Sequence, residues 1–348
     1  MDSGEARLQP IADSFSAFAG TPPTKIESVE AHASGRVIAR LSGENFGTVI
    51  GSHEPDWAEA SAFLYLARHF KSHKLPVPQI FFVDQSQQIV LMEDLGRETL
   101  YDVLCHQRIE GAEVTESVEH LYHRALNDLP KFQYEAGRLV DFARCHPVPE
   151  FSPTDMRADC QLFLNSFVDV TGIRGNRPAL EGELALLVDL LTKDTQWDAF
   201  MYRDFQSRNI MVRDGTLGYI DFQGGRRGPL AYDVASLLYQ SRAGLSAGMR
   251  ARLLTSYCQA AAAIPQFDED LFRSEFDKWV IIRLLQAVGR AGELGFRKKK
   301  ELFWSGLPKG LALLQTVLHS ERLSFQPIAL RDYVDALIEL LPSEPQRN

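Results

Sequence analysis

The segment 201–222 constrains this chain more than any other part of its sequence. In this segment Asp204 is followed, after four intervening residues, by Asn209, and Asp221 stands further on at the end of a short apolar run. Two apolar runs flank a polar turn at 213–218, which predicts a β-hairpin. The hairpin would place Asn209 at the start of one strand and Asp221 at the end of its neighbour, so that both side chains can face one metal ion.

These three side chains suit the transfer of a phosphoryl group. Asp204 can accept the proton of an attacking hydroxyl, whereas Asn209 and Asp221 offer the hard oxygen ligands that Mg²⁺ prefers. Such a transfer needs a positioned nucleophile and fixed charge around the phosphates. A single Asp or Asn in a loop is more often a turn former or a helix cap. The joint spacing nevertheless favours a catalytic Asp204, a metal site at Asn209 and Asp221, and ATP and Mg²⁺ as cofactors.

The motifs around these residues resemble a known family. They read Arg-Asp-Phe-Gln-Ser-Arg-Asn-Ile-Met at 203–211, Ile-Asp-Phe-Gln at 220–223 and Tyr-Asp-Val-Ala-Ser-Leu-Leu at 232–238. Over about residues 25–320 the chain is similar to the aminoglycoside phosphotransferase (APH/choline kinase-like) superfamily. Asp-Phe-Gln-Ser-Arg-Asn, and Asp-Phe-Gln followed by Arg-Gly-Pro, look most like the bacterial anomeric kinases of N-acetylmuramate and N-acetylglucosamine. The resemblance implies an α+β, protein-kinase-like bilobed fold, with a small antiparallel-sheet N-lobe and a larger, mainly helical C-lobe.

Apolar periodicity divides the chain as this fold would require. We expect an N-terminal lobe at 1–95 and a C-terminal helical lobe at 96–348. In the first lobe, helices are expected at 5–20 and 56–74, and strands at 25–31, 36–41, 45–51, 80–84 and 89–92. Helices of the second lobe are expected at 117–145 (kinked or divided at Pro130), 155–171, 180–191, 231–242, 246–264, 268–292, 309–320 and 329–341.

The resemblance also implies where a nucleotide would bind. A turn at Ser34 and Gly35 would cover the phosphates, because Gly35 has no Cβ to keep its backbone N–H away from oxygen atoms. An apolar strand that runs into Glu93-Asp-Leu-Gly96 resembles the hinge between the lobes. Backbone groups from Glu93 to Leu95 would then bind the adenine edge. An ordinary hairpin turn and an ordinary strand end are the alternatives.

The third expected strand departs from the wider kinase pattern. Kinases usually carry a lysine there, which pairs with the phosphates and with a helix glutamate. The segment 48–51 has no lysine, although the next helix offers Glu59. The missing cation is expected to come from Arg40 or Arg36 on the second strand. Arg40 as an ordinary surface residue is the alternative.

Four further residues are expected to support the site or contact the acceptor. Asp233 resembles the helix-start aspartate that holds the catalytic loop by hydrogen bonds, and a helix N-terminus also favours an acid there. Arg208 could hold a phosphate or a carboxylate with two hydrogen bonds. Gln223 and Arg226 follow Asp221 and are expected on the acceptor side. Tyr202 stands where the family most often has His.

Composition excludes several other classes of protein. The 348 residues carry a net charge of −9, which argues against general nucleic-acid binding. Four scattered cysteines form no metal-binding motif and are expected to be reduced. The N-terminal residues lack a signal-peptide pattern, and no apolar run has the length of a membrane span. We therefore expect a cytoplasmic protein without a membrane or nucleic-acid partner, and its oligomeric state is left open.

The sequence thus predicts an ATP-dependent kinase whose partner is a small molecule with an acceptor hydroxyl. The resemblance implies an amino sugar, with its anomeric hydroxyl as one possible site. Choline, homoserine or an aminoglycoside is the alternative acceptor. The missing strand lysine and Tyr202 leave open a nucleotide-binding pseudokinase, against which the complete Asp204, Asn209 and Asp221 set argues. A metal-dependent hydrolase is disfavoured because no His-rich motif is present.

Overall fold

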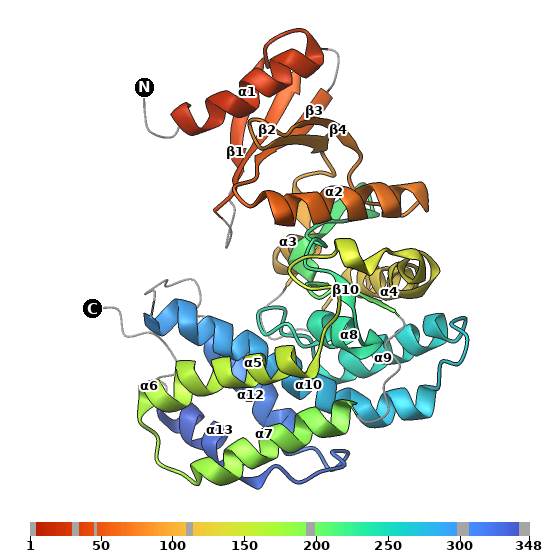
Figure 1. The fold of residues 1–348 in the computed structure, drawn as a ribbon. Helices are drawn as coiled ribbons and strands as arrows, with labels where there is room; N and C mark the ends of the chain where they lie inside the picture. Colours follow the sequence, from red (N-terminus) through yellow and green to blue (C-terminus); the bar gives the residue numbers. More distant parts are fainter. Residues whose placement is uncertain are drawn as a thin grey trace.

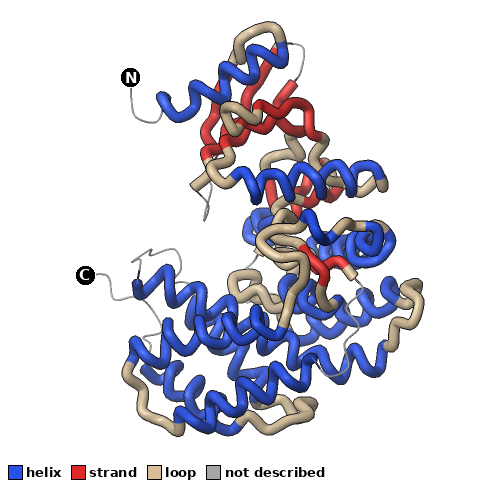
Figure 2. The backbone as a smooth tube through the Cα atoms, in the orientation of Figure 1, coloured by secondary structure: helices blue, strands red, loops and turns tan. Residues whose placement is uncertain are grey.

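Strands gather in one part of the molecule and helices in the other. The computed structural model describes residues 5–29, 35–44, 47–108, 114–192, 199–297 and 306–340. Figure 1 shows the strand-rich N-terminal part above the larger helical part, with helix α2 crossing between them. Helices dominate the lower part of Figure 2. The predicted α+β combination of an antiparallel sheet and a mainly helical region is therefore present.

The N-terminal part is a five-stranded sheet in which all neighbouring strands are antiparallel. Helix α1 (Glu5–Ala19) covers one of its faces, where Phe15 joins Leu41, Val49 and Leu91 in a small separate core. The strands lie in the spatial order β1 (Lys25–Val29), β2 (Val37–Gly43), β3 (Gly47–His53), β5 (Ile89–Glu93) and β4 (Ile80–Asp84).

Helix α2 (Trp57–Ser72) joins the sheet to the helical part. Its buried face belongs to the larger core and not to the core beneath α1. Phe63 stacks on Phe222 with ring centroids 5.2 Å apart, and Phe70 meets the same ring edge-on at 5.7 Å. Aromatic pairs in these arrangements stabilise beyond their buried area. The helix is thereby fastened to the residue that follows Asp221.

The rest of the chain consists of helices and two short sheets. The short sheets are β6 (Glu98–Thr99) with β8 (Ile210–Arg213) and β9 (Thr216–Tyr219), and β7 (Phe200–Met201) with β10 (Arg226–Arg227). The central helix is α10 (Glu269–Gly292), which packs against α5 (Pro153–Phe163), α8 (Leu230–Leu238) and α12 (Leu307–Leu318). The other α-helices are α3 (Leu100–His106), α4 (Glu116–Pro130), α5 (Pro153–Phe163), α6 (Asp169–Thr171), α7 (Arg177–Thr192), α8 (Leu230–Leu238), α9 (Ala247–Ala261), α12 (Leu307–Leu318) and α13 (Ile328–Leu340). Across the described residues, no helix combines the length and apolarity needed to cross a bilayer.

Two of the predicted helices are interrupted. The pattern at 117–145 corresponds to α4, which ends at Pro130, followed by a π-helical turn at Lys131–Glu135 and two short 3₁₀ turns. The predicted division at Pro130 is confirmed, and its missing N–H gives the reason. The pattern at 155–171 contains a π-helical turn at Leu164–Val168 between α5 and α6. Apolar periodicity alone does not reveal such a turn, because apolar residues continue through it.

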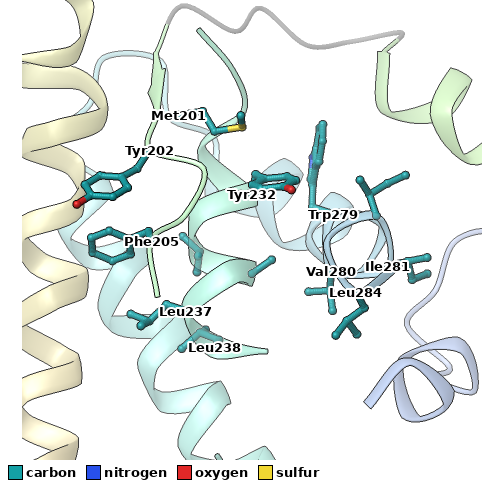
Figure 3. Close-up of a cluster of buried hydrophobic side chains, with 14 of the residues drawn as sticks. Met201, Tyr202, Phe205, Tyr232, Leu237, Leu238, Trp279, Val280, Ile281 and Leu284 are labelled. Carbon is teal, nitrogen blue, oxygen red and sulfur yellow. The ribbon is translucent and has the colours of Figure 1, made fainter. Parts of the chain in front are cut away.

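A hydrophobic cluster supports the segment that carries Asp204. Met201, Tyr202 and Phe205 are each at most 1% exposed. Figure 3 shows them beside Tyr232 of α8, with the apolar side chains of α10 across from that helix. Because such interiors are close-packed, the backbone around Asp204 has little freedom to shift.

Candidate active site

The predicted hairpin is present and brings Asn209 and Asp221 together. Strands β8 and β9 pair in antiparallel fashion. Asp214 and Gly215 form the turn with φ values of 50° and 72°, the positive values that a tight Asp-Gly hairpin turn adopts. The N–H of Ile220 donates to the carbonyl of Asn209 at 3.0 Å. Backbone pairing therefore continues from the strands up to the two functional side chains.

The side-chain amide of Asn209 connects all three predicted residues. Its Nδ2 donates to the backbone carbonyl of Asp204 at 2.9 Å and to Oδ2 of Asp221 at 3.2 Å. Asp221 has a φ of 68°, in the left-handed region that non-glycine residues seldom adopt. Such backbone conformations are typical of active sites. Asp204, Asn209 and Asp221 therefore share one site.

The donor set at this site fits a divalent cation. The hydrogen bonds of Asn209 use its Nδ2. Its Oδ1 and the carboxylate of Asp221 are then hard oxygen donors on adjacent side chains. The described part of the chain contains no cluster of three or more His, Cys, Asp or Glu side chains placed to hold a metal. Mg²⁺ does not need one, because it is usually held by one or two carboxylates together with phosphate oxygens and water.

Electrostatics at the site favour the binding of positive charge. Loss of surrounding water, and then the negative charge of Asp204, raise the pKa of Asp221 above its ordinary value, while Gln223 and Arg36 oppose the rise. The Asp204 carboxylate itself accepts only a long hydrogen bond, 3.4 Å from Nε2 of Gln206, among the described contacts. A cation would relieve the repulsion between the two carboxylates.

A buried carboxylate holds the loop that carries Asp204. Asp233, in the first turn of α8, is fully buried. It accepts hydrogen bonds from the backbone N–H groups of Tyr202 and Arg203, both at 2.8 Å, and from Nε2 of Gln133 at 2.9 Å. Burial raises the pKa of Asp233 to about 7, although these three donors act in the opposite direction. The structure thus contains the hydrogen bonds that the resemblance implied for Asp233.

Two glutamines that the sequence did not single out complete this support. Oε1 of Gln133 accepts the hydroxyl proton of Tyr257 at 2.7 Å. Oε1 of Gln240 accepts from both the N–H and the hydroxyl of Ser207, at 3.0 and 2.7 Å. Because these partners are distant in sequence, no local motif could have identified them.

Tyr202 links the loop that carries Asp204 to the segment that carries Asp221. The residue is completely buried, and its hydroxyl donates to the backbone carbonyl of Ile220 at 2.6 Å. Ile220 directly precedes Asp221. The tyrosine therefore supports the geometry of the site, and its difference from the usual His does not argue for an inactive protein.

Residues from the N-terminal part reach the same site. Glu59, in the first turn of α2, lies 3.1 Å from a guanidinium nitrogen of Arg36. Gln223 was expected on the acceptor side, but its Nε2 donates to Asp221 at 2.7 Å and lies 3.3 Å from Oε1 of Glu59. Two carboxylates therefore draw its amide towards α2, and its contact with an acceptor stays a prediction.

The guanidinium of Arg40 is bound by groups in the segment that follows β5. Its Nε and Nη2 donate to the carboxylate of Asp94 at 2.6 and 3.0 Å, and Nη2 also donates to the carbonyl of Gly96 at 2.6 Å. Burial alone would raise the pKa of Asp94, but hydrogen bonds from Arg40 and Thr48 hold it below its ordinary value. Arg40 therefore braces the segment after β5, which corrects the predicted phosphate contact.

Replacing Arg40 with Ala is expected to lower the free energy of unfolding by about 3–5 kcal/mol, because the Asp94 carboxylate would stay buried without its partner. Urea denaturation followed by tryptophan fluorescence would measure the loss. Arg97→Ala is the control, since it removes an exposed partner of Glu27 and should leave stability unchanged. An Arg40→Ala protein as stable as the wild type would contradict the bracing role.

The other predicted nucleotide contacts lie around β2 and at the end of β5. Ser34 lies outside the described residues, and Gly35 stands just before β2. The N–H of Glu93 already donates to the carbonyl of Gln79 at 2.8 Å. Leu95 is half-buried, and its own N–H and carbonyl take no part in the hydrogen bond between Glu93 and Gln79.

The two arginines predicted near the acceptor differ in burial. Arg226 is 1% exposed, its Nε donates to the carbonyl of Gly224 at 3.1 Å, and its Nη1 lies 3.8 Å from Asp155. Because Arg226 is buried and contacts other parts of the protein interior, a supporting role is favoured over direct contact with an acceptor. Arg208 is half-buried, and burial, followed by the positive charge of Arg242, lowers its pKa.

Residues 26–269 match the model of the phosphotransferase enzyme family, APH. The chain belongs to this family. The prediction of a phosphotransferase with an alcohol group as acceptor is confirmed by this match and by relatives that are named as kinases.

Curated bacterial relatives resemble the phosphotransferase over most of its length. The N-acetylmuramate/N-acetylglucosamine kinase of Pseudomonas aeruginosa is 27% identical over 335 residues, which are 93% of this chain and 90% of that relative. The kinase of the same name from Pseudomonas putida is 24% identical over 309 residues, covering 87% of this chain and 86% of the relative. The predicted resemblance to kinases of these two sugars is confirmed.

Solved structures share the fold of the phosphotransferase at low sequence identity. A choline/ethanolamine kinase family protein from Mesorhizobium loti has a TM-score of 0.62 at 12% identity and covers 95% of this chain and 100% of that chain. Amicoumacin kinase in complex with AMP-PNP, Ca²⁺ and Ami has a TM-score of 0.61 at 11% identity, covering 88% and 92%. These likenesses confirm the fold class.

Proposed function

We propose that this phosphotransferase moves the terminal phosphate of ATP, with Mg²⁺ present, to a hydroxyl group of an amino sugar. One observation carries the proposal: Nδ2 of Asn209 lies 2.9 Å from the carbonyl of Asp204 and 3.2 Å from the carboxylate of Asp221. This arrangement gathers a base and two metal ligands, which phosphoryl transfer requires. Membership of the family supports the reaction class.

Asp204 would act on the acceptor. Its carboxylate would accept the hydroxyl proton while the acceptor oxygen bonds to the terminal phosphorus and the bond from phosphorus to the departing ADP oxygen breaks. Asn209 and Asp221 would hold Mg²⁺, which offsets the negative charge of the phosphates when it is bound. Asp233 would keep the loop of Asp204 in place through its hydrogen bonds to the backbone.

We place the nucleotide between an N-terminal lobe of residues 1–95 and a C-terminal lobe of residues 96–348. Glu59 belongs to the first of these lobes, whereas Asp221 and Gln223 belong to the second. The amide of Gln223 lies 3.3 Å from Glu59 and 2.7 Å from Asp221, so side chains from both lobes meet at the proposed metal site.

The remaining nucleotide contacts would come from backbone groups. The segment Glu93–Leu95 connects the two lobes, and the peptide groups of Leu95 would bind the adenine edge. Gly35 would lie over the phosphates, where a residue without a Cβ permits close approach.

The amino-sugar acceptor rests on the relatives and on charge around Arg208. Relatives that are 27% and 24% identical are named for N-acetylmuramate and N-acetylglucosamine. Burial, and then the charge of Arg242 in the segment after α8, lower the pKa of Arg208, so two positive charges lie near the loop that carries Asp204. The carboxylate of N-acetylmuramate would be attracted there, whereas a polycationic aminoglycoside would be repelled.

A panel of acceptors tests this function directly. Purified protein would be incubated with ATP, Mg²⁺ and either N-acetylmuramate, N-acetylglucosamine, choline, homoserine or kanamycin, with ADP release as the readout. We expect turnover of the two sugars, with the lower KM for N-acetylmuramate because of its carboxylate. Phosphorus NMR of the product would show whether the phosphate is on the anomeric oxygen.

The panel also separates the alternatives. Preferred turnover of choline, homoserine or kanamycin would replace the amino sugar with that acceptor. Binding of ATP without ADP release in the presence of any acceptor would contradict catalysis and support a pseudokinase.

A further inference from the structure

Strand β3 carries no lysine or arginine. Its residue Ser52 lies opposite Ile38 of β2. Directly opposed residues share a face of the sheet, and so do alternate residues of one strand. Ser52 and Ile38 therefore lie on the same side of the sheet, and the hydroxyl of Ser52 donates to Glu54 at 2.6 Å. Strand β3 thus carries the small polar side chain of Ser52, which contacts the carboxylate of Glu54.

The cation beside this acidic side chain is Arg36. Its Nε lies 2.7 Å from Glu54 and its Nη2 lies 3.1 Å from Glu59. Its Nη1 lies 3.8 Å from Oδ1 of Asp221, the proposed metal ligand. In the described part of the chain, no other basic side chain forms an ion pair with Asp221. Arg36 therefore joins the sheet, α2 and the metal site.

The three nitrogens of the Arg36 guanidinium face three different carboxylates at different distances. The contacts at 2.7 and 3.1 Å are ion pairs with Glu54 and Glu59, whereas Asp221 lies further away, at 3.8 Å. A guanidinium has five N–H donors in a rigid fork. Two of its nitrogens hold it in place, and Nη1 remains directed towards the site without a hydrogen bond to Asp221.

The surrounding charge favours an anionic ligand at Nη1 only if a metal is also present. Arg36 contacts three carboxylates, which leave the cluster with excess negative charge. A divalent cation on Asp221 would remove that repulsion and leave Nη1 for a phosphate oxygen. Arg40 cannot take this place, because Asp94 and Gly96 hold its guanidinium.

We propose that Arg36 is the side chain that binds the nucleotide phosphates, held by Glu54 and Glu59 in place of a lysine on β3. The inference rests on the proposed use of a nucleotide, but not on the identity of the acceptor. Such a contact is made with the phosphates alone, so it should distinguish ADP from adenosine.

Isothermal titration of the full chain with ADP and Mg²⁺, without any acceptor, tests this role. Arg36→Ala is expected to weaken ADP binding by about 10–100-fold, the loss typical of a hydrogen bond between charged groups. Its affinity for adenosine should stay that of the wild type. Arg273→Ala, which removes a partly exposed partner of Glu269, is the matched control and should bind both ligands normally.

A positive charge placed on β3 should restore the ADP affinity that Arg36→Ala loses. Arg36→Ala combined with Ser52→Lys places an ammonium on β3 beside Glu54, and it should recover most of the ADP affinity. If Arg36→Ala alone does not fold, Arg36→Gln with Glu54→Gln removes both charges of the buried pair and should still show the selective loss of ADP affinity.

Three results would overturn the assignment. The first is ADP binding that is unchanged in folded Arg36→Ala protein. The second is an equal loss of ADP and adenosine affinity, which a purely structural role would produce. The third is a wild-type protein that binds ADP no better than adenosine. A wild type that binds ADP selectively but phosphorylates no sugar would instead contradict the amino-sugar proposal.

Discussion

Asp204→Asn is expected to lower the rate of phosphoryl transfer by about 10²–10⁴-fold, the contribution typical of a positioned general base. Asparagine keeps the shape of the side chain and removes the proton acceptor. Folding should be unaffected, because the described contacts of the Asp204 carboxylate consist of one 3.4 Å hydrogen bond from Gln206. ADP release with the best acceptor would measure the rate, and titration with ADP should show unchanged affinity.

Asp214→Asn is the matched control for this substitution. Asp214 lies in the β8–β9 turn with a φ of 50°, a conformation that asparagine tolerates well. The control should keep full activity. If Asp204→Asn transferred phosphate at the wild-type rate, the catalytic assignment of Asp204 would be wrong.

Asp233→Asn is expected to reduce the free energy of unfolding by about 2–4 kcal/mol. Oδ1 of Asp233 accepts from Arg203, and Oδ2 accepts from Tyr202 and Gln133. In either orientation, the asparagine NH₂ group would face at least one of these N–H donors. Urea denaturation would measure the loss, and phosphoryl transfer should fall with it because the loop of Asp204 loses its support.

An exposed aspartate at a helix start supplies the control. Asp270→Asn changes an acid in the first turn of α10 that is exposed to solvent, and it should leave stability and transfer unchanged. Wild-type stability in Asp233→Asn would show that the three hydrogen bonds contribute little.

The elements that follow from local patterns were predicted well. The strand expected at 80–84 is β4, and the hairpin around Asp214 and Gly215 forms β8 and β9. The expected helix at 268–292 differs from α10 by one residue at its start. Turn chemistry and apolar periodicity depend on neighbouring residues, which is why a single sequence is sufficient for them.

The charge network was less predictable. Arg36 and Arg40 were both candidates for the missing cation, because the strand expected at 36–41 contained both, whereas β2 of the structure begins at Val37. The choice depends on Asp94, which holds Arg40, and on Glu54, which lies 2.7 Å from Arg36. Neither partner follows a local pattern, since each is set by how separate strands and helices pack.

The support of the catalytic loop was also only partly visible in the sequence. Asp233 was recognised because a family motif surrounds it. Gln133, which donates to Asp233, and Tyr257, which donates to Gln133, belong to helical segments whose polar residues carry no such motif. The contacts of Gln223 with Asp221 and Glu59 were not predicted, because the order of residues in the chain does not tell which way an amide turns.

The separate core beneath α1 has a mechanical consequence. Strands β2 and β3 pack with α1, whereas α2 is fastened to Phe222 through Phe63. If the sheet tilted as one body, Arg36 would travel with it and Glu59 would stay behind. The 3.1 Å ion pair between them would then stretch or break. Its length would therefore report how far the sheet has moved relative to α2.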